Sequence, residues 1–359
     1  MKRIILFIQI FLMSGIASQA CTNEPPEANK NIEKVSRLVI NDLLTRDGLM
    51  MYNTPGLHTI HYAEICTAFG AIRLAREFND TSLLHQLEKR YQGLLNHFDT
   101  LPTNHVDANV AGTLPLELYR WNGKKDYLQM GLKMADTQWE NPQSDGLSKQ
   151  TRYWIDDMYM IGILQIEAFK VTNKQVYLDR AAMELDAYLQ KLQQPNGLFF
   201  HGPNAPFCWG RGNGWVAVAL AEIIAVLPST DSHYASILSG YKRMMDALIE
   251  NQTPNGMWRQ LVDNKNAWEE TSATAMFGYS IKLGVNKGIL SGEKYQNAYE
   301  QAWIALTKHI SEQGKLTDIC VGTGQSSDIT YYLTRPVTKG DLHGQAPTLW
   351  FALSLISTK

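Results

Sequence analysis

Acidic residues stand beside aromatic residues at well separated points of the sequence. Asp156 and Asp157 follow Trp154, Asp107 follows a histidine, and Glu270 lies two residues after a tryptophan. Carboxyl groups in partly buried positions can donate and accept protons, and the face of an indole packs well against a sugar ring. This combination is typical of a carbohydrate site. Asp107 and Asp156 are therefore candidate site carboxyls, with Trp154, His61 and His343 as further polar or aromatic candidates in comparable positions.

The segment 209–215 (WGRGNGW) is the most distinctive local motif. Its three glycines predict a tight turn whose backbone can approach a ligand, with Trp209, Arg211 and Trp215 held nearby. The glycine spacing matches neither dinucleotide-binding nor P-loop motifs, which argues against a nucleotide site. A guanidinium offers a carboxylate two parallel hydrogen bonds, so Arg211 is predicted to bind a carboxylate. A structural ion pair with a neighbouring acid is the alternative.

The composition excludes several classes of partner. Thirty-three Lys and Arg stand against 35 Asp and Glu, for a net charge of -2. This balance argues against a broad basic face for nucleic acid. The four cysteines show no spacing that suggests a metal site, and no residue pattern calls for an organic cofactor.

The first residues are typical of an export signal. Lys2 and Arg3 precede an apolar run over 4–13, and small residues lead to Cys21. We expect residues 1–20 to be a signal peptide, Cys21 to be a lipidated first residue, and 21–27 to be a short tether. This would make the protein an exported periplasmic or cell-envelope lipoprotein of a bacterium. An ordinary secretory signal with an incidental cysteine is the alternative, and no later stretch approaches the roughly 20 apolar residues of a membrane span.

Two kinds of helical segment alternate along the rest of the chain. The first kind is apolar on several sides, as buried helices are. These segments lie near 61–78, 107–121, 156–171, 214–227, 270–284 and 344–356. The second kind has one apolar and one charged face, as surface helices do. These segments lie near 28–45, 83–98, 125–138, 175–192, 233–251 and 293–310.

The turns between these segments repeat as well. Asn122-Gly123-Lys124 and Thr172-Asn173-Lys174 both follow inner segments, and glycine turns follow outer ones near 48, 146, 197, 256 and 314. A recurring helix pair of this kind predicts a helical repeat array, either an open solenoid or a closed ring. Strict alternation of six pairs favours an all-α (α/α)6 barrel that forms a single domain over 28–359. The starts of the inner helices, which carry the candidate residues, then meet at one rim.

Four segments together resemble glycoside hydrolase family 105, the unsaturated rhamnogalacturonyl hydrolases and their relatives. They are 154–160 (WIDDMYM), 209–215, 268–273 (WEETSA) and 318–323 (DICVGT), and the resemblance covers nearly the whole chain after the predicted signal. It implies an (α/α)6 barrel that removes a 4,5-unsaturated uronic acid from the non-reducing end of an oligosaccharide left by a polysaccharide lyase. Family 88 is similar in fold and chemistry.

The resemblance also implies roles for individual residues. Asp156 is the proton donor and then the base, and Asp107 orients water or sugar hydroxyls. Asp156 protonates C4 of the double bond, water adds at C5, and the resulting hemiketal opens to release the neighbouring sugar. Apolar neighbours such as Trp154 and Met158 would keep Asp156 protonated. The resemblance and the positions at the starts of the inner helices together predict seven substrate-binding residues. They are Arg211, His201, Trp209, Trp215, Trp154, His61 and His343.

The sequence departs from the family pattern at two places, and several alternatives stay open. Gln345-Ala346-Pro347 follows His343 where Gly-Ala-Phe is usual, and the stretch from His201 to Trp209 is short. Asp157 competes with Asp156 for the role of acid, with an exposed helix cap as its structural alternative. A conventional inverting glycosidase would also use Asp107 and Asp156. A polysaccharide lyase and a non-catalytic sugar-binding lipoprotein are the remaining possibilities.

Overall fold

The computed structural model describes residues 27–54 and 57–357. The predicted signal peptide at 1–20, the lipidation site Cys21 and the predicted tether up to residue 26 lie outside the described residues. The first helix begins at Glu27, one residue before the predicted start of the barrel domain.

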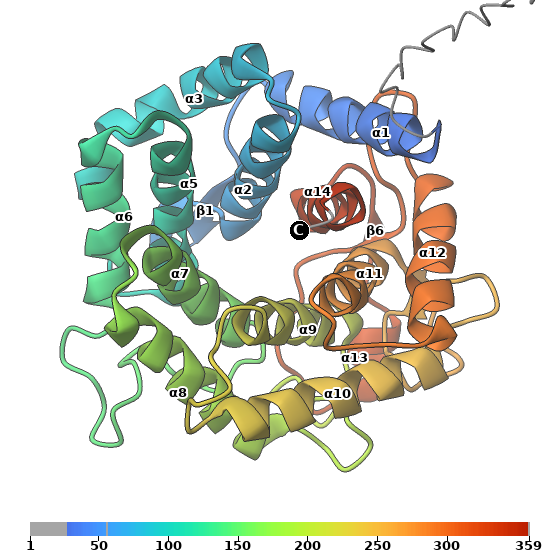
Figure 1. Ribbon diagram of the computed structural model, residues 1–359. Coiled ribbons are helices and arrows are strands. Elements are labelled where there is room, and N and C mark those ends of the chain that lie inside the picture. Colours follow the sequence, from blue (N-terminus) through green and yellow to red (C-terminus); the bar gives the residue numbers. More distant parts are fainter. Residues whose placement is uncertain (1–26, 55–56, 358–359) are drawn as a thin grey trace, which may run out of the picture.

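Within the described residues, twelve long helices form two concentric rings around one axis (Figure 1). The inner ring consists of α2 (Tyr62–Glu77), α5 (Thr113–Asn122), α7 (Asp157–Thr172), α9 (Gly210–Ile224), α11 (Thr271–Asn286) and α14 (Leu342–Ile356). The outer ring consists of α1 (Glu27–Leu44), α3 (Thr81–Asn96), α6 (Lys125–Thr137), α8 (Gln175–Leu192), α10 (Tyr234–Asn251) and α12 (Glu293–Thr307). The predicted (α/α)6 barrel is confirmed, and the open solenoid was the wrong alternative.

The inner helices are buried on almost every side. Every residue of α9 is buried, and α11 and α14 are buried over most of their length. Outer helices such as α8 bury only one face. The apolar residues of the two rings form one continuous core that extends from Ile32 to Leu353. Removal of this apolar surface from water is the main term that stabilises the barrel.

Four of the five glycine turns predicted after outer helices have the same geometry, whereas Gly48, which follows α1, does not have their positive φ. Gly146, Gly197, Gly256 and Gly314 all have φ between 77° and 88°, and each donates its N–H to the carbonyl three residues earlier at 2.9 Å. Gly123 and Asn173 end two inner helices in the left-handed conformation. The repeated helix pairs are therefore connected by turns with the same backbone conformation.

Short elements lie between the helices on the side where the inner helices begin. Three two-stranded antiparallel sheets pair β1 (Met51–Thr54) with β2 (Leu57–Ile60), β3 (Trp258–Arg259) with β4 (Glu269–Glu270), and β5 (Ile319–Cys320) with β6 (Val337–Thr338). The short helices are α4 (Val106–Asn109), α13 (Ile329–Leu333), η1 (Phe98–Thr100) and η2 (Val110–Gly112).

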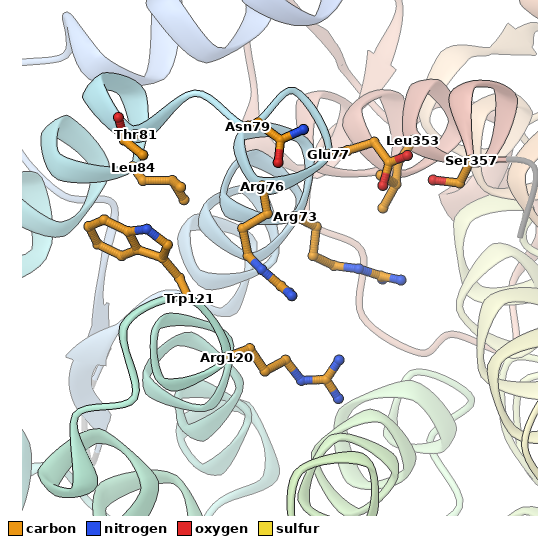
Figure 2. A pocket seen from close by; sticks show the side chains of 10 residues that line it. All are labelled: Arg73, Arg76, Glu77, Asn79, Thr81, Leu84, Arg120, Trp121, Leu353 and Ser357. Atoms are coloured by element: carbon orange, nitrogen blue, oxygen red, sulfur yellow. The ribbon is translucent and has the colours of Figure 1, made fainter.

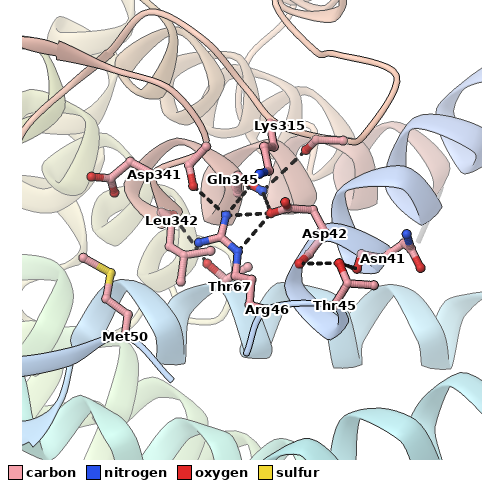
Figure 3. A network of polar contacts seen from close by, with 12 residues as sticks. Asn41, Asp42, Thr45, Arg46, Met50, Thr67, Lys315, Asp341, Leu342 and Gln345 are labelled. Carbon is pink, nitrogen blue, oxygen red and sulfur yellow. Dashed lines mark hydrogen bonds and ion pairs between the residues drawn. The ribbon is translucent and has the colours of Figure 1, made fainter. Parts of the chain in front are cut away.

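A polar network closes the ring between its first and last helices (Figure 3). Arg46, just after α1, donates to Asp42 at 2.6 Å and to the carbonyl of Gly340 at 2.5 Å. Gln345 of α14 is fully buried and donates to the same Asp42 carboxylate. Gln345, which departs from the family pattern, thus has a structural role in which it ties α14 to α1.

Charged side chains fill the end of the barrel where the inner helices finish. Arg73, Glu117, Arg120, Glu167, Lys170 and Glu222 are linked by ion pairs of 2.8–3.7 Å. A cavity of about 470 Å³ opens beside them, and Arg73, Arg76 and Arg120 extend along its wall (Figure 2). Every carboxylate of this cluster has a cationic partner, which is what burial of charge requires. The residues predicted for the site lie at the opposite end.

Across the described residues, every helix is too short or too polar to cross a lipid bilayer.

Candidate functional site

Asp156 lies at the start of α7, directly before its first residue. Its side chain is 15% exposed, and its Oδ2 lies 3.7 Å from Nε2 of His201. Burial, together with the negative charges of Asp157 and Asp107, raises the pKa of Asp156 to about 7. A carboxyl with this pKa is partly protonated at neutral pH and can act as an acid there. The sequence named apolar neighbours as the cause; the charges of two further carboxylates also contribute.

Asp157 points away from Asp156 into a different environment. It is fully buried, and Arg152 donates to both of its oxygens at 3.1–3.2 Å. The hydroxyl of Tyr188 on α8 donates to the same carboxylate at 3.0 Å and accepts the N–H of Tyr153, which has a φ of 57°. The predicted alternative of an exposed cap was wrong, because Asp157 is buried. Its bonds to Arg152 and Tyr188 hold the chain segment that precedes α7 in place. With its oxygens occupied, Asp157 is a poorer candidate acid than Asp156.

Asp107 lies in the first turn of α4 and also faces the site. Its side chain is 15% exposed, and the hydroxyl of Tyr52 donates to its Oδ2 at 3.2 Å. Tyr52 comes from β1 and stacks on His61 with 4.1 Å between the ring centroids. Through Tyr52, the β1–β2 hairpin therefore forms the part of the site next to Asp107.

His201 is completely buried beside Asp156. Its Nδ1 lies 2.7 Å from the hydroxyl of Tyr332, and its ring packs on Trp209 with 4.7 Å between centroids. Burial and the charge of Arg211 lower the pKa of His201 to about 3, so its ring is neutral and its contact with Asp156 is not an ion pair. If Tyr332 donates to Nδ1, the proton of His201 sits on Nε2 and points toward Asp156.

Arg211 does not form the predicted open clamp for a carboxylate. It is fully buried, and its Nη1 and Nη2 donate to the backbone carbonyls of Cys320 and Val321. Glu270 accepts the N–H of Cys320 at 2.9 Å, so the two side chains together hold this short strand. These carbonyls occupy the pair of N–H groups at the tip of the guanidinium, so a substrate carboxylate cannot bind that pair while the bonds persist. Only Nε of Arg211 is buried without a hydrogen-bond partner.

The three predicted tryptophans differ in exposure. Trp209 and Trp215 are buried, the first against Arg211 and the second between Tyr159 and Trp350. The prediction that they stack on the sugar is wrong for this structure, because protein groups cover their rings. Trp154 is partly exposed, and its ring meets His201 edge-on at 5.9 Å.

His61 caps α2 and is partly exposed at the site. Its Nδ1 accepts the N–H of Ala63 at 3.1 Å, which places the ring proton on Nε2. Burial and the neighbouring His343 lower the pKa of His61 to about 3, so it is a neutral hydrogen-bonding group. It lies between Tyr52 and Tyr62, with ring centroids 4.1 and 4.5 Å away.

His343 is 2% exposed, and both of its ring nitrogens have protein partners. Nδ1 lies 2.6 Å from Oδ1 of Asp341, and Nε2 lies 2.7 Å from the hydroxyl of Tyr62. Direct binding of substrate by His343, as predicted, would require one of these bonds to break. Tyr62, which is partly exposed, lies between His343 and the site.

The glycine motif is helical, which corrects the predicted tight turn. Helix α9 begins at Gly210. A Cβ at Gly210 would lie 2.7 Å from the carbonyl oxygen of Arg259, and one at Gly212 would lie 2.8 Å from Ile155. The glycines therefore permit close packing of α9 against its neighbours, and the ligand approach predicted for them is not their role.

Five buried polar atoms that have no hydrogen-bond partner among the described residues belong to residues predicted for the site. They are Oδ2 of Asp156, Nε2 of His201, Nε of Arg211 and Nε1 of Trp209 and Trp215. Unpaired buried polar groups are costly unless another molecule satisfies them. Of the four nitrogens, Nε2 of His201 lies 3.7 Å from the carboxyl oxygen, and all four are donors that oxygen atoms of a polar ligand would satisfy.

Several site residues were not identified from the sequence. Tyr52, Tyr62 and Tyr332 contact site residues far away in the sequence. Arg152 and Asp341 contact Asp157 and His343, which are near neighbours in the sequence. Tyr62 could have been found, because it directly follows the helix-start residue His61. Nothing in the local sequence of Tyr332 places it against His201, 131 positions earlier.

Comparison with known proteins identifies the family. The family model described as Glycosyl Hydrolase Family 88 matches residues 34–359. An unsaturated rhamnogalacturonyl hydrolase of Bacillus subtilis is 22% identical over 282 residues, which cover 73% of this chain and 80% of the relative. An unsaturated 3S-rhamnoglycuronyl hydrolase of Alteromonas sp. is 28% identical over 244 residues, 64% of this chain and 57% of the relative.

A solved structure shares the fold over almost its entire length. The crystal structure of a possible family 105 member from Salmonella enterica superposes with a TM-score of 0.80 at 20% identity, and the match covers 96% of this chain and 99% of the other. The predicted resemblance is thus confirmed in both the sequence and the fold. The protein belongs to glycosyl hydrolase family 88.

Proposed function

We propose that the protein removes a 4,5-unsaturated uronic acid from the non-reducing end of oligosaccharides that a polysaccharide lyase has produced. The observation that carries this proposal is the environment of Asp156. Its pKa is raised to about 7, its Oδ2 is buried, and that oxygen has no hydrogen-bond partner within the described chain. The activities named for the Bacillus and Alteromonas relatives support the same reaction.

The reaction requires one acid that later serves as a base. Protonated Asp156 donates its proton to C4 of the double bond, and water adds at C5 as its proton passes to the Asp156 carboxylate. The product is a hemiketal, which opens and releases the neighbouring sugar. Asp156 ends each cycle protonated, so a single carboxyl with a pKa near neutrality is sufficient.

The other site residues support this step. Asp107, held by Tyr52, orients the water or the sugar hydroxyls. Neutral His61 and His201 supply hydrogen bonds without adding positive charge that would favour ionisation of Asp156. Partly exposed Trp154 provides an indole surface for the sugar. The Nε–H of Arg211, which has no hydrogen-bond partner among the described residues, is a donor for the uronate.

The experiment follows the ultraviolet absorbance of the unsaturated sugar on oligosaccharides that lyases release from pectin, ulvan and glycosaminoglycans. The proposal expects a loss of absorbance with release of the adjoining sugar. Hydrolysis of saturated glycosides would instead support a conventional inverting glycosidase, whose two carboxyls flank the scissile bond. A rise in absorbance on intact polymer would indicate a lyase, and binding without turnover a sugar-binding protein.

We also propose that the chain is exported and lipidated at Cys21. The charged start, the apolar run over 4–13 and the small residues before the cysteine support this. Labelled fatty acid should be incorporated into the full chain expressed in a bacterium, and Cys21→Ser should abolish this labelling. Equal labelling of both, or of neither, would refute lipidation at this residue.

A further inference from the structure

His201 is held next to the start of α7 by contacts of its backbone and of its ring. Its carbonyl accepts the N–H of Ile155, the residue before Asp156, at 3.2 Å. Its ring contacts the indoles of Trp209 and Trp154, with centroids 4.7 and 5.9 Å away. These contacts fix the position of the imidazole beside the acid of the site.

The segment 325–332 contacts His201 at two further points. Nε2 of Gln325 donates to the carbonyl of His201 at 3.1 Å. Gly202 leaves room for this amide, because a Cβ at that position would overlap the Gln325 side chain. The hydroxyl of Tyr332, in α13, lies 2.7 Å from Nδ1 of the His201 ring. One short segment therefore holds both the backbone and the ring of His201.

The hydrogen bonds of Tyr332 determine which way its hydroxyl points. The backbone N–H of Ser326 can only donate, and it donates to the Tyr332 oxygen at 3.2 Å. Tyr332 is completely buried, and burial raises its pKa to about 12, so the hydroxyl keeps its own proton. Within residues 27–54 and 57–357, the other hydrogen-bond partner of this hydroxyl is Nδ1 of His201. Tyr332 therefore donates its proton to Nδ1.

This bond fixes the tautomer of His201. Burial and the charge of Arg211 lower the pKa of His201 to about 3, so at neutral pH the ring carries one proton. Because Nδ1 accepts from Tyr332, that proton lies on Nε2. The opposite tautomer would leave the Tyr332 proton buried without an acceptor, which is costly.

Nε2 of His201 lies close to the acid of the site without bonding to it. It is 3.7 Å from Oδ2 of Asp156, beyond the ordinary N–H···O range of about 2.7–3.2 Å. Both atoms are buried and have no hydrogen-bond partner among the described residues. From this position, an Nε2 without a proton would accept the proton of Asp156 and remove the acid. An Nε2 that carries a proton cannot accept it, but it can donate to a carboxylate.

We propose that Tyr332 holds His201 in the tautomer that leaves the proton on Asp156 and that donates to the carboxylate formed when this proton moves to C4. The proposal rests on the hydration reaction proposed above. A hydrogen bond to an ionised carboxylate is stronger than one to a neutral carboxyl, so Nε2–H stabilises the transition state more than the resting site. The water that adds at C5 returns a proton to Asp156, and His201 keeps one proton throughout. Tyr332 is a positioning residue, because it acts through His201.

The first test compares Tyr332→Phe with Tyr331→Phe on the unsaturated oligosaccharide that the wild type consumes fastest. Tyr331→Phe is the matched control, because it removes the neighbouring hydroxyl, which accepts the N–H of Gly324 at 3.0 Å. The donor on His201 matters in the transition state, so Tyr332→Phe should lower kcat by about 10- to 100-fold with little change in KM. Tyr331→Phe should keep both constants close to those of the wild type. An equal loss of kcat in the two variants, or a rise in KM alone, would overturn the proposal.

The second test asks whether Tyr332 acts through His201. Tyr332→Phe is combined with His201→Leu, which removes the ring to which Tyr332 donates. The double variant should be no slower than His201→Leu alone, since the hydroxyl then has no ring to orient. A role of Tyr332 in packing or in placing Ser326 would instead lower kcat by the same factor in both backgrounds, and that result contradicts the proposal.

The third measurement needs no substrate. Ring ¹⁵N spectra of the full chain, with the His201 signals identified from the spectrum of His201→Leu, should show a bare Nδ1 and a protonated Nε2 at neutral pH. Tyr332→Phe removes the donor to Nδ1, so the Nδ1 signal should shift, whereas Tyr331→Phe should leave it in place. A wild type with its proton on Nδ1, or with both nitrogens protonated, refutes the tautomer even if Tyr332→Phe does not fold.

These outcomes separate the role of Tyr332 from the proposed function. A wild type that is inactive on every unsaturated oligosaccharide refutes the hydration reaction, and with it the catalytic part of this inference. An active wild type whose Tyr332→Phe variant is as fast as Tyr331→Phe refutes only the role of Tyr332.

Discussion

Nε2 of His201 lies 3.7 Å from Oδ2 of Asp156, and neither atom has a hydrogen-bond partner among the described residues. Both side chains sit where water has little access, and His201 is neutral because burial lowers its pKa to about 3. The charge of Arg211 favours ionisation of Asp156, but burial and the charges of Asp157 and Asp107 outweigh it. The site is therefore arranged to keep its acid protonated until substrate arrives.

Replacement of Asp156 should separate it from its neighbour in the sequence. Asp156→Asn removes the transferable proton, so kcat should fall by about 10²- to 10⁴-fold while the fold is retained. Asp157→Asn should keep turnover and lower the free energy of unfolding by about 1–3 kcal/mol, because it weakens the bonds to Arg152 and Tyr188. Absorbance assays and thermal unfolding of both variants check this. The reverse pattern would assign the acid to Asp157.

The basic limb of the pH profile should report the pKa of Asp156. The carboxyl must be protonated to deliver its proton, so kcat/KM should be highest below pH 7 and fall as the pH rises through about 7. Asp107→Asn removes a negative charge that raises this pKa, so the limb should move to lower pH. A limb that stays in place would show that the charge of Asp107 does not act on Asp156.

Asp156 should also make stability depend on pH. Its pKa rises from 3.8 in the unfolded chain to about 7 in the fold, so its favourable contribution is complete below 3.8 and lost as the pH rises through 7. Relative to wild type, Asp156→Asn should become more stable between pH 5 and pH 8, by about 3 kcal/mol. Denaturant unfolding of both proteins at the two pH values measures this. A constant difference would mean that Asp156 titrates normally.

Gly210 should be needed for packing at the start of α9. An alanine Cβ there would meet the carbonyl oxygen of Arg259 at 2.7 Å, and that backbone cannot move without displacing β3. Gly210→Ala should lower stability by about 1–3 kcal/mol. Gly93→Ala is the control, since nothing lies within 4 Å of its Cβ and alanine is the better helix former. Similar melting temperatures for the two variants would contradict the packing role.

The fold was predictable because the repeat is local. Periodicity separates the wholly buried helices from the helices with one charged face, and positive-φ turns at Gly146 and Gly197 mark the same point in successive pairs. The closure of the ring was not visible in this way. It depends on the hydrogen bond between Gln345 and Asp42, which lie 303 positions apart. Nothing in the local sequence shows that the amide of Gln345 is buried and makes this contact.

The site was predictable where function depends on the start of a helix. Asp156, Asp107 and His61 lie at such starts and face the site. The exposure of Arg211 and Trp215 was predicted wrongly, because residue type and spacing do not show whether a side chain turns toward the axis or the rim. Their burial follows from glycines that draw α9 against its neighbours, a tertiary effect.

The network of Asp42, Arg46 and Gln345 joins the last helix pair to the first. The ring of helices is therefore continuous, and the packing does not depend on which helix comes first in the chain. A circularly permuted chain that links α14 to α1 and opens at the exposed turn around Gly123 would keep every helix contact on which the site depends. Such turns lie at the end of the barrel away from Asp156, where insertions and fusions would leave the mouth unobstructed.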